Sequence, residues 1–219
     1  VGRSPQEWWG EWKQSHDDGT TWSAAERLPL GILGPIRAKP IQLPYGTMLA
    51  GSSTEHDGWR VHFERTADLG KTWRSTGPIH DGRTFGAIQP TLLLHPDGRL
   101  QALCRSQQQR IVETWSTDGG LSWSSMQATS LPNPSAGIDS LTLADGRLLL
   151  VYNHTSRRDG ERPRDGTRSE LNLAISDDGV DWQAALLLER RPGEFSYPAM
   201  IQGRDGKVHL SYTHRRRQI

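Results

Sequence analysis

The sequence predicts an all-β protein built as a β-propeller. Three observations predict it: a repeated octapeptide, a second repeat of apolar runs interrupted by turns, and a composition rich in turn residues. The 219 residues include 23 Gly, 13 Pro and 9 Trp, and we find no segment with convincing helical periodicity. Because both repeats recur at about 50 residues, the length typical of a propeller blade, the chain accounts for about four blades.

The octapeptide reads hydroxyl, any residue, Asp, any residue, Gly, any residue, hydroxyl, Trp. Its copies are 15–22, 66–73, 116–123 and 175–182, and only the last departs from the pattern, at Ile175 and Asp181. The Asp can accept hydrogen bonds from turn amides, and Gly allows the positive φ of a tight turn. These segments lack the alternating acidic ligands and closing Glu of a calcium loop, so we expect no metal. We expect all four octapeptides on one face and their tryptophans buried: Trp22, Trp73, Trp123 and Trp182.

The second repeat consists of apolar runs with a central turn, at 41–49, 91–103, 141–151 and 200–212. Such runs around a Gly-containing turn predict β-hairpins. Each blade is therefore expected to hold an inner hairpin and an outer hairpin closed by the octapeptide. The extra length in the third blade, 155–167, is rich in Arg, Asp and Gly and is expected to be an inserted loop.

Charge and composition exclude several functions. The net charge of +1 argues against a nucleic-acid-binding surface. The single cysteine, Cys104, rules out an intrachain disulfide, and no segment is long enough to cross a membrane. The chain starts in what would be an outer strand and ends just after an inner hairpin. We therefore expect 1–219 to be one propeller domain that lacks N-terminal and C-terminal parts, since six blades would need on the order of 100 further residues.

Blade geometry predicts where a site would lie. If the inner turns and the octapeptides share one face, the starts and ends of the inner hairpins share the other. Counting from the turns places Gln89, Gly137 and Tyr197 at one equivalent position and Ser53, Arg105, Asn153 and Thr213 at another. We expect a mouth lined by Gln89, Tyr197, Arg105 and Asn153, with Lys39 at the start of its own inner strand and Arg168 following the insertion.

These motifs resemble those of the sialidases (neuraminidases), in which the octapeptides are called Asp boxes or BNR repeats. The resemblance rests on the octapeptides together with Gln89, Arg105, Arg168 and Tyr197. It implies a six-bladed propeller that removes a terminal sugar acid from a glycan and needs no cofactor. Three arginines would hold the sugar carboxylate and a tyrosine would attack the anomeric carbon.

Carried over by position, Arg105 and Arg168 match two of the three arginines, and Tyr197 matches the nucleophile. Lys39 and Asn153 are expected to contact the substrate. Nothing in the chain matches the third arginine or the acid/base Asp of the family, so we expect these residues alone to be inactive.

Gln89 departs from the family pattern, which has a Glu at this position to take the tyrosine proton. A glutamine can hydrogen-bond the phenol but cannot accept its proton at neutral pH. Either another group acts as the base, for which Glu55, Glu194 and His62 are the candidates, or the chemistry differs from ordinary sialoside hydrolysis.

Three functions remain open. The first is an exo-acting hydrolase of the sialidase type. The second is an enzyme that acts on another anionic sugar such as a uronic acid, as hydrolase or lyase, which Gln89 favours. The third is a non-catalytic propeller that binds anionic glycans or a protein, because a fold does not determine a function.

Overall fold

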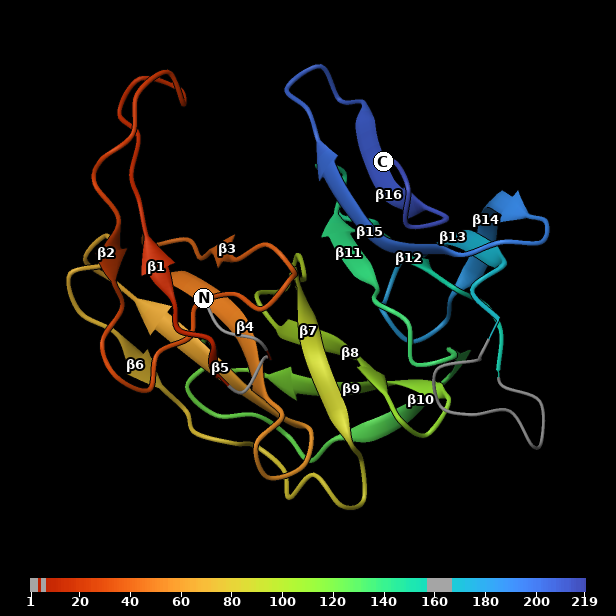
Figure 1. Ribbon diagram of the computed structural model, residues 1–219, viewed down its shortest axis with the longest axis horizontal. Coiled ribbons are helices and arrows are strands. Elements are labelled where there is room, and N and C mark those ends of the chain that lie inside the picture. Colours follow the sequence, from red (N-terminus) through yellow and green to blue (C-terminus); the bar gives the residue numbers. More distant parts are fainter. Residues whose placement is uncertain (1–3, 5–6, 157–166) are drawn as a thin grey trace.

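The structure is a computed structural model that describes residues 4, 7–156 and 167–219. The described residues contain no α-helix and form antiparallel sheets (Figure 1). The predicted insertion at 155–167 lies mostly outside the described residues. A two-stranded sheet comes first, formed by β1 (Glu11–Trp12) and β2 (Glu26–Arg27).

Three four-stranded sheets follow, each with its strands in sequence order. Sheet I contains β3 (Ile41–Gln42), β4 (Met48–Thr54), β5 (Arg60–Thr66) and β6 (Arg74–Ser75). Sheet II contains β7 (Ala87–Leu94), β8 (Leu100–Ser106), β9 (Arg110–Ser116) and β10 (Gln127–Pro132). Sheet III contains β11 (Asp139–Thr142), β12 (Leu148–Tyr152), β13 (Glu170–Ser176) and β14 (Gln183–Arg190). The chain ends in the hairpin of β15 (Phe195–Gln202) and β16 (Val208–His214).

The four predicted inner hairpins are confirmed as the pairs β3–β4, β7–β8, β11–β12 and β15–β16. The inner strands of successive sheets contact one another, β4 with β7, β7 with β11 and β11 with β15. Apolar side chains fill the spaces between the sheets in three clusters. One lies between sheets I and II around Phe63, one between sheets II and III around Ile138, and one between sheet III and the last hairpin around Phe195. Hydrophobic burial between sheets therefore sets how they stack.

The octapeptides close turns at one end of the sheets. In the third copy the Asp118 carboxylate accepts hydrogen bonds from the Ser122 amide (2.9 Å) and hydroxyl (2.5 Å). The Ser116 hydroxyl accepts one from the Gly120 amide (2.9 Å). The bonds from Ser122 lower the pKa of Asp118 to about 2. The strand registers put this end of each sheet beside the inner turn, since Leu100 faces Ser116.

In the fourth octapeptide, the residues that form the turn differ by one position from those expected from the sequence. Its hydroxyl is Ser176 and its turn carboxylate is Asp178, not the predicted Asp177. The Asp178 carboxylate accepts hydrogen bonds from the amides of Val180 and Asp181, both at 2.8 Å. This turn is one residue shorter than the others, which explains why the pattern failed at Ile175.

The expectation that all four octapeptide tryptophans are buried is wrong. Trp22 is 61% exposed, and the loop that carries it extends away from the sheets (Figure 1). The other three are half-buried, because each ring lies at a sheet end and covers the preceding sheet with one face. The Trp123 ring, for example, stacks on Phe63 of sheet I with 3.7 Å between ring centroids. These tryptophans thus connect neighbouring sheets rather than fill one core.

Candidate active site

Two residues at the opposite end of the sheets have strained backbones. Gln89 in β7 has a φ of 57° and Tyr197 in β15 has a φ of 52°. Each lies at a β-bulge and precedes a proline, Pro90 or Pro198, although pre-proline residues favour extended conformations. Such backbones cost on the order of 1–3 kcal/mol and gather at functional sites. The bulges redirect both side chains into the same cavity.

The equivalent position before the first inner turn is Arg37, which precedes β3 and was missed in the sequence analysis in favour of Lys39. Arg37 has a φ of 74° and lies eight residues before Tyr45 of the first inner turn. Gln89 and Tyr197 lie equally far before Asp97 and Asp205. Applying the count to the first turn, which has Tyr45 where the others have Asp, would have found Arg37.

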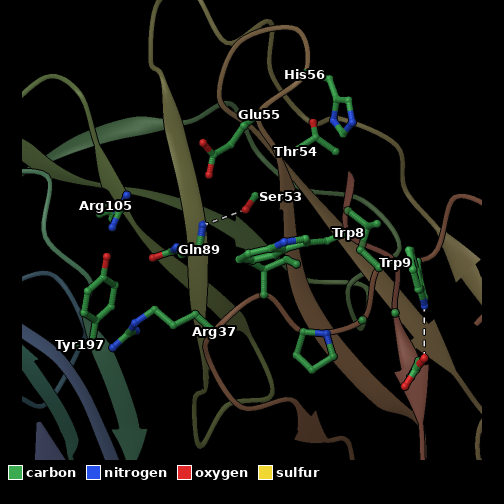
Figure 2. Close-up of a pocket in the computed structure, with 16 residues that line it drawn as sticks. Trp8, Trp9, Arg37, Ser53, Thr54, Glu55, His56, Gln89, Arg105 and Tyr197 are labelled. Carbon is green, nitrogen blue, oxygen red and sulfur yellow. Dashed lines mark hydrogen bonds between the residues drawn. The ribbon is translucent and has the colours of Figure 1, made fainter. Parts of the chain in front are cut away.

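The cavity has a volume of about 780 Å³ and opens between the first sheets and β15. Figure 2 shows Tyr197, Arg37, Arg105 and Gln89 on one side of it and the two tryptophans of the N-terminal segment on the other. Its polar and aromatic lining comprises Trp8, Trp9, Glu11, Arg37, Ser53, Thr54, Glu55, His56, Gln89, Arg105 and Tyr197. Of the six predicted site residues, the lining includes Gln89, Arg105 and Tyr197.

Arginines surround the Tyr197 ring. The guanidinium carbons of Arg37 and Arg168 each lie 5.7 Å from its centroid. Burial opposes ionisation of the phenol, but the positive charges of Arg105 and Arg168 and their hydrogen bonding outweigh it. The pKa of Tyr197 is therefore lowered. This phenol is easier to ionise than an ordinary tyrosine, which suits it to act as a nucleophile or base.

Arg105 ends β8 and is buried, with 8% of its surface exposed. Its Nε and Nη1 atoms have no hydrogen-bond partner among the described residues. Its guanidinium carbon lies 5.1 Å from the centroid of the Trp59 ring. A buried guanidinium with unused donors beside a cavity is well suited to bind a planar anion such as a carboxylate.

The remaining predicted residues are engaged with the protein. Arg168 binds Glu194 at 3.0 Å and contacts Tyr197 without lining the cavity. Lys39 forms an ion pair with the buried carboxylate of Asp139 at 2.9 Å. The Asn153 amide nitrogen donates to the carbonyls of Glu170 and Phe195, both at 2.9 Å. Lys39 and Asn153 therefore connect inner elements and do not face the cavity.

Gln89 lies between Arg105 and Tyr197 on one side and Ser53 on the other (Figure 2). Its backbone amide donates to the Ser53 hydroxyl at 3.2 Å. Its side-chain Oε1 is buried without a hydrogen-bond partner among the described residues. The amide thus keeps an acceptor available at the wall of the cavity.

Of the three candidate bases, Glu55 lines the cavity and the other two do not. Burial lowers the pKa of Arg105. The negative charges of Tyr197 and Glu55 oppose this shift without cancelling it. Glu194 accepts hydrogen bonds from Arg168, Arg216 and Ser196. His62 is buried and binds Glu64 at 2.9 Å. Of these three candidates, Glu55 is therefore the one placed to exchange protons with a ligand in the cavity.

The described residues contain no group of three or more His, Cys, Asp or Glu side chains placed to hold a metal ion. They also contain no helix long and apolar enough to cross a membrane.

Comparison with known proteins gives one family and a set of related folds. Residues 1–210 match the family described as the BNR repeat-like domain. A Dyadobacter fermentans protein of unknown function superposes with a TM-score of 0.73 at 19% identity, covering 91% of this chain and 58% of that one. The NanB sialidase from Streptococcus pneumoniae gives 0.71 at 16%, covering 92% and 32%. The intramolecular trans-sialidase from Ruminococcus gnavus gives 0.69 at 20%, covering 92% and 45%.

These structures share the fold of this chain, and the chain spans between about a third and three fifths of their lengths.

Proposed function

The chain belongs to the BNR repeat-like domain family, and we propose that it is part of a six-bladed, sialidase-type propeller enzyme. The proposed activity is that of an exo-acting glycoside hydrolase, which removes a terminal anionic sugar acid from a glycan. The observation that supports it most is the cavity in which Tyr197, with its lowered pKa, lies beside the buried, unpaired donors of Arg105.

In this proposal Arg105 holds the sugar carboxylate, with Arg168 adding positive charge. The Tyr197 oxygen forms a bond to the anomeric carbon while the bond from that carbon to the leaving oxygen breaks. Glu55 gives a proton to the leaving oxygen and then removes one from the water that hydrolyses the tyrosyl intermediate. Two successive displacements would retain the anomeric configuration. The positive charges of Arg105 and Arg168 would offset the repulsion between the Tyr197 phenolate and the carboxylate on the reacting carbon.

Gln89 would hydrogen-bond the phenol or the sugar but would not take the phenol proton. The positive charges around Tyr197 would replace the missing carboxylate base, because they stabilise the phenolate itself. In this proposal Tyr197 loses its proton to solvent before the attack, because Glu55 holds the proton that the leaving oxygen receives.

The same amide favours a second function, a lyase for uronic acids. Tyr197 would then remove the proton from C5 of a uronide whose carboxylate is neutralised by Arg105. The released electron pair would form the C4–C5 double bond, and the C4 oxygen would leave with the proton that Tyr197 took from C5. Gln89 would donate a hydrogen bond to the carboxylate, which a glutamate could not do in its ionised form.

The test is an assay of the full-length protein against fluorogenic sialosides and against uronic-acid oligosaccharides. Release of fluorophore from a sialoside would support the hydrolase, and an unsaturated, ultraviolet-absorbing product would support the lyase. Tyr197→Phe is the matched control, since either reaction should disappear with the phenol oxygen. Binding of anionic glycans without turnover of any substrate would contradict both and favour the non-catalytic propeller.

A further inference from the structure

We propose that Arg37 is a positioning residue that holds the Tyr197 segment across the mouth of the cavity, and that it does not bind the substrate carboxylate. The proposal rests on the proposed function only in taking Tyr197 as the reacting group.

The guanidinium of Arg37 joins three parts of the molecule. Arg37 precedes β3 of sheet I, and its Nη1 donates to the carbonyl of Ile138, just before β11 of sheet III. Its Nη2 donates to the carbonyl of Pro198 in β15, directly after Tyr197. Nη2 thus supports the backbone at the bulge that aims the phenol, and Nη1 ties the guanidinium to the start of β11, which contacts β15.

The equivalent position of sheet III leaves room for this contact. It is occupied by Gly137, and a Cβ added there would lie 2.7 Å from Arg37 Nε and 3.2 Å from Tyr197 Cδ1. A distance of 2.7 Å is below any real carbon contact, so a side chain at 137 would displace the Arg37 guanidinium or the Tyr197 ring. Three equivalent positions therefore carry Arg37, Gln89 and Tyr197, and the fourth carries no side chain.

The segment that precedes Arg37 is also anchored, by a buried carboxylate of sheet I. The fully buried carboxylate of Glu64 accepts hydrogen bonds from the amides of Leu33 (2.8 Å) and Gly34 (2.6 Å), which lie in the segment that leads to Arg37. His62 binds the same carboxylate at 2.9 Å. This segment is anchored independently of any ligand, so Arg37 can act as a fixed support for Tyr197.

Arg37 and Arg105 differ in the donors that they leave available. Bidentate binding of a carboxylate uses two guanidinium donors in parallel. Nη1 and Nη2 of Arg37 each donate to a carbonyl, and its Nε, which has no partner among the described residues, packs against Gly137. Arg105 keeps both Nε and Nη1 without partners among the described residues, at the wall of the cavity. Loss of Arg37 should therefore misplace Tyr197 and leave substrate affinity nearly unchanged.

The test uses Arg37→Lys, Arg37→Gln and Gly137→Ala in the full-length protein. The control is Arg99→Gln, in the turn just before β8 and far along that strand from Arg105. With whichever substrate the assays identify, kcat should fall about 10- to 100-fold in the three variants, and KM should change less than about twofold. Arg105→Ala should instead raise KM. A higher KM with unchanged kcat in the Arg37 variants would make Arg37 a ligand and overturn the proposal.

A second measurement does not need a substrate. The chain has four tyrosines, and the ¹³Cζ NMR signal of Tyr197 can be assigned by its loss in Tyr197→Phe. The signal should shift in Arg37→Gln and in Gly137→Ala, while those of the other tyrosines stay in place. The other charged groups facing the ring, Arg105 and Arg168, remain in both variants. An unchanged Tyr197 signal in folded protein would refute the positioning role even if no activity is found.

Gly137→Ala keeps every charge, so it also serves if loss of Arg37 prevents folding.

Discussion

The two ends of the sheets differ in how their polar groups are hydrogen-bonded and in where their backbones have positive φ angles. At the octapeptide end, each turn carboxylate accepts several hydrogen bonds, as Asp118 does from Ser122 and Ser116. At the cavity end, buried polar atoms of Gln89 and Arg105 lack partners among the described residues. Positive φ angles lie in turns at the first end but inside strands at the second, at Gln89 and Tyr197.

This difference shows where stability and function reside. Satisfied turns that recur in every sheet lower the free energy of the folded state, since hydrogen-bonded polar groups need no further ligand. Strained backbones and unused donors raise that free energy and persist only when the surrounding structure maintains them. Mutations at the two ends should therefore have opposite consequences for stability and activity.

The largest effect is expected from Tyr197→Phe. Only the phenol oxygen is lost, so the ring still packs between Arg37 and Arg168. Turnover should fall by at least about 100-fold while ligand binding persists, as measured by kinetics and calorimetry with the same substrate. Tyr212→Phe, which removes a phenol bonded to Glu189, should leave turnover unchanged. Full activity in Tyr197→Phe would rule out Tyr197 as the reacting group.

Arg105→Met should separate binding from stability. Removing one arm of a buried charge clamp typically costs about 2–5 kcal/mol of ligand binding. The free energy of unfolding should stay equal or rise, because the lost guanidinium has donors that the described residues leave unpaired. Denaturant titration and calorimetric binding measure the two quantities. Arg99→Met, which removes an exposed ion pair with Asp97, should leave binding unchanged; a large loss of stability in Arg105→Met would mean that Arg105 has a structural role.

Gln89→Glu should have a smaller effect, of about tenfold, in the direction of higher sialoside turnover. In the native protein, turnover should rise with pH as the phenol ionises, and it should fall as pH drops below the lowered pKa of Tyr197. A carboxylate at 89 would take the phenol proton, so the acidic limb of the pH–rate profile should move to lower pH. Loss of activity in this variant, with uronide cleavage by the native protein, would instead favour the lyase.

Much of the fold follows from the sequence because the octapeptides and inner turns are local patterns. The hairpins at Gly98 and Gly146, for example, were predicted from the residues on either side of each glycine, and both glycines have the positive φ of a tight turn. The exposure of Trp22 could not be predicted in the same way, because the burial of such a ring depends on which sheet lies beside it. The turn carboxylate of the fourth octapeptide was assigned wrongly because the sequence offers two adjacent candidates, Asp177 and Asp178. Only the hydrogen bonds of Ser176 distinguish them.

The candidate site was predictable only by counting along strands. The count placed Gln89, Arg105 and Tyr197 at one cavity, since equivalent positions in repeated sheets point to the same end. It said nothing of partners, so it could not foresee that Lys39 pairs with Asp139. Nor could it foresee the bonds of Asn153 to the carbonyls of Glu170 and Phe195, which join segments far apart in the chain.

The smallest effect is expected at the octapeptide end, from Asp118→Ala. Loss of the hydrogen bonds from Ser122 should lower the Tm by roughly 2–4 °C, and turnover per folded molecule should not change. The folded-state pKa of Asp118, about 2, lies below the value of an unfolded aspartate. Its contribution to stability is therefore fully present above about pH 4 and disappears as pH falls toward 2. The Tm difference between native and variant protein should shrink over that interval, as thermal unfolding at several pH values would show. A difference that persists at pH 2 would mean that the stabilisation does not depend on ionisation of Asp118. A loss of turnover at neutral pH would mean that the two ends of the sheets are not independent.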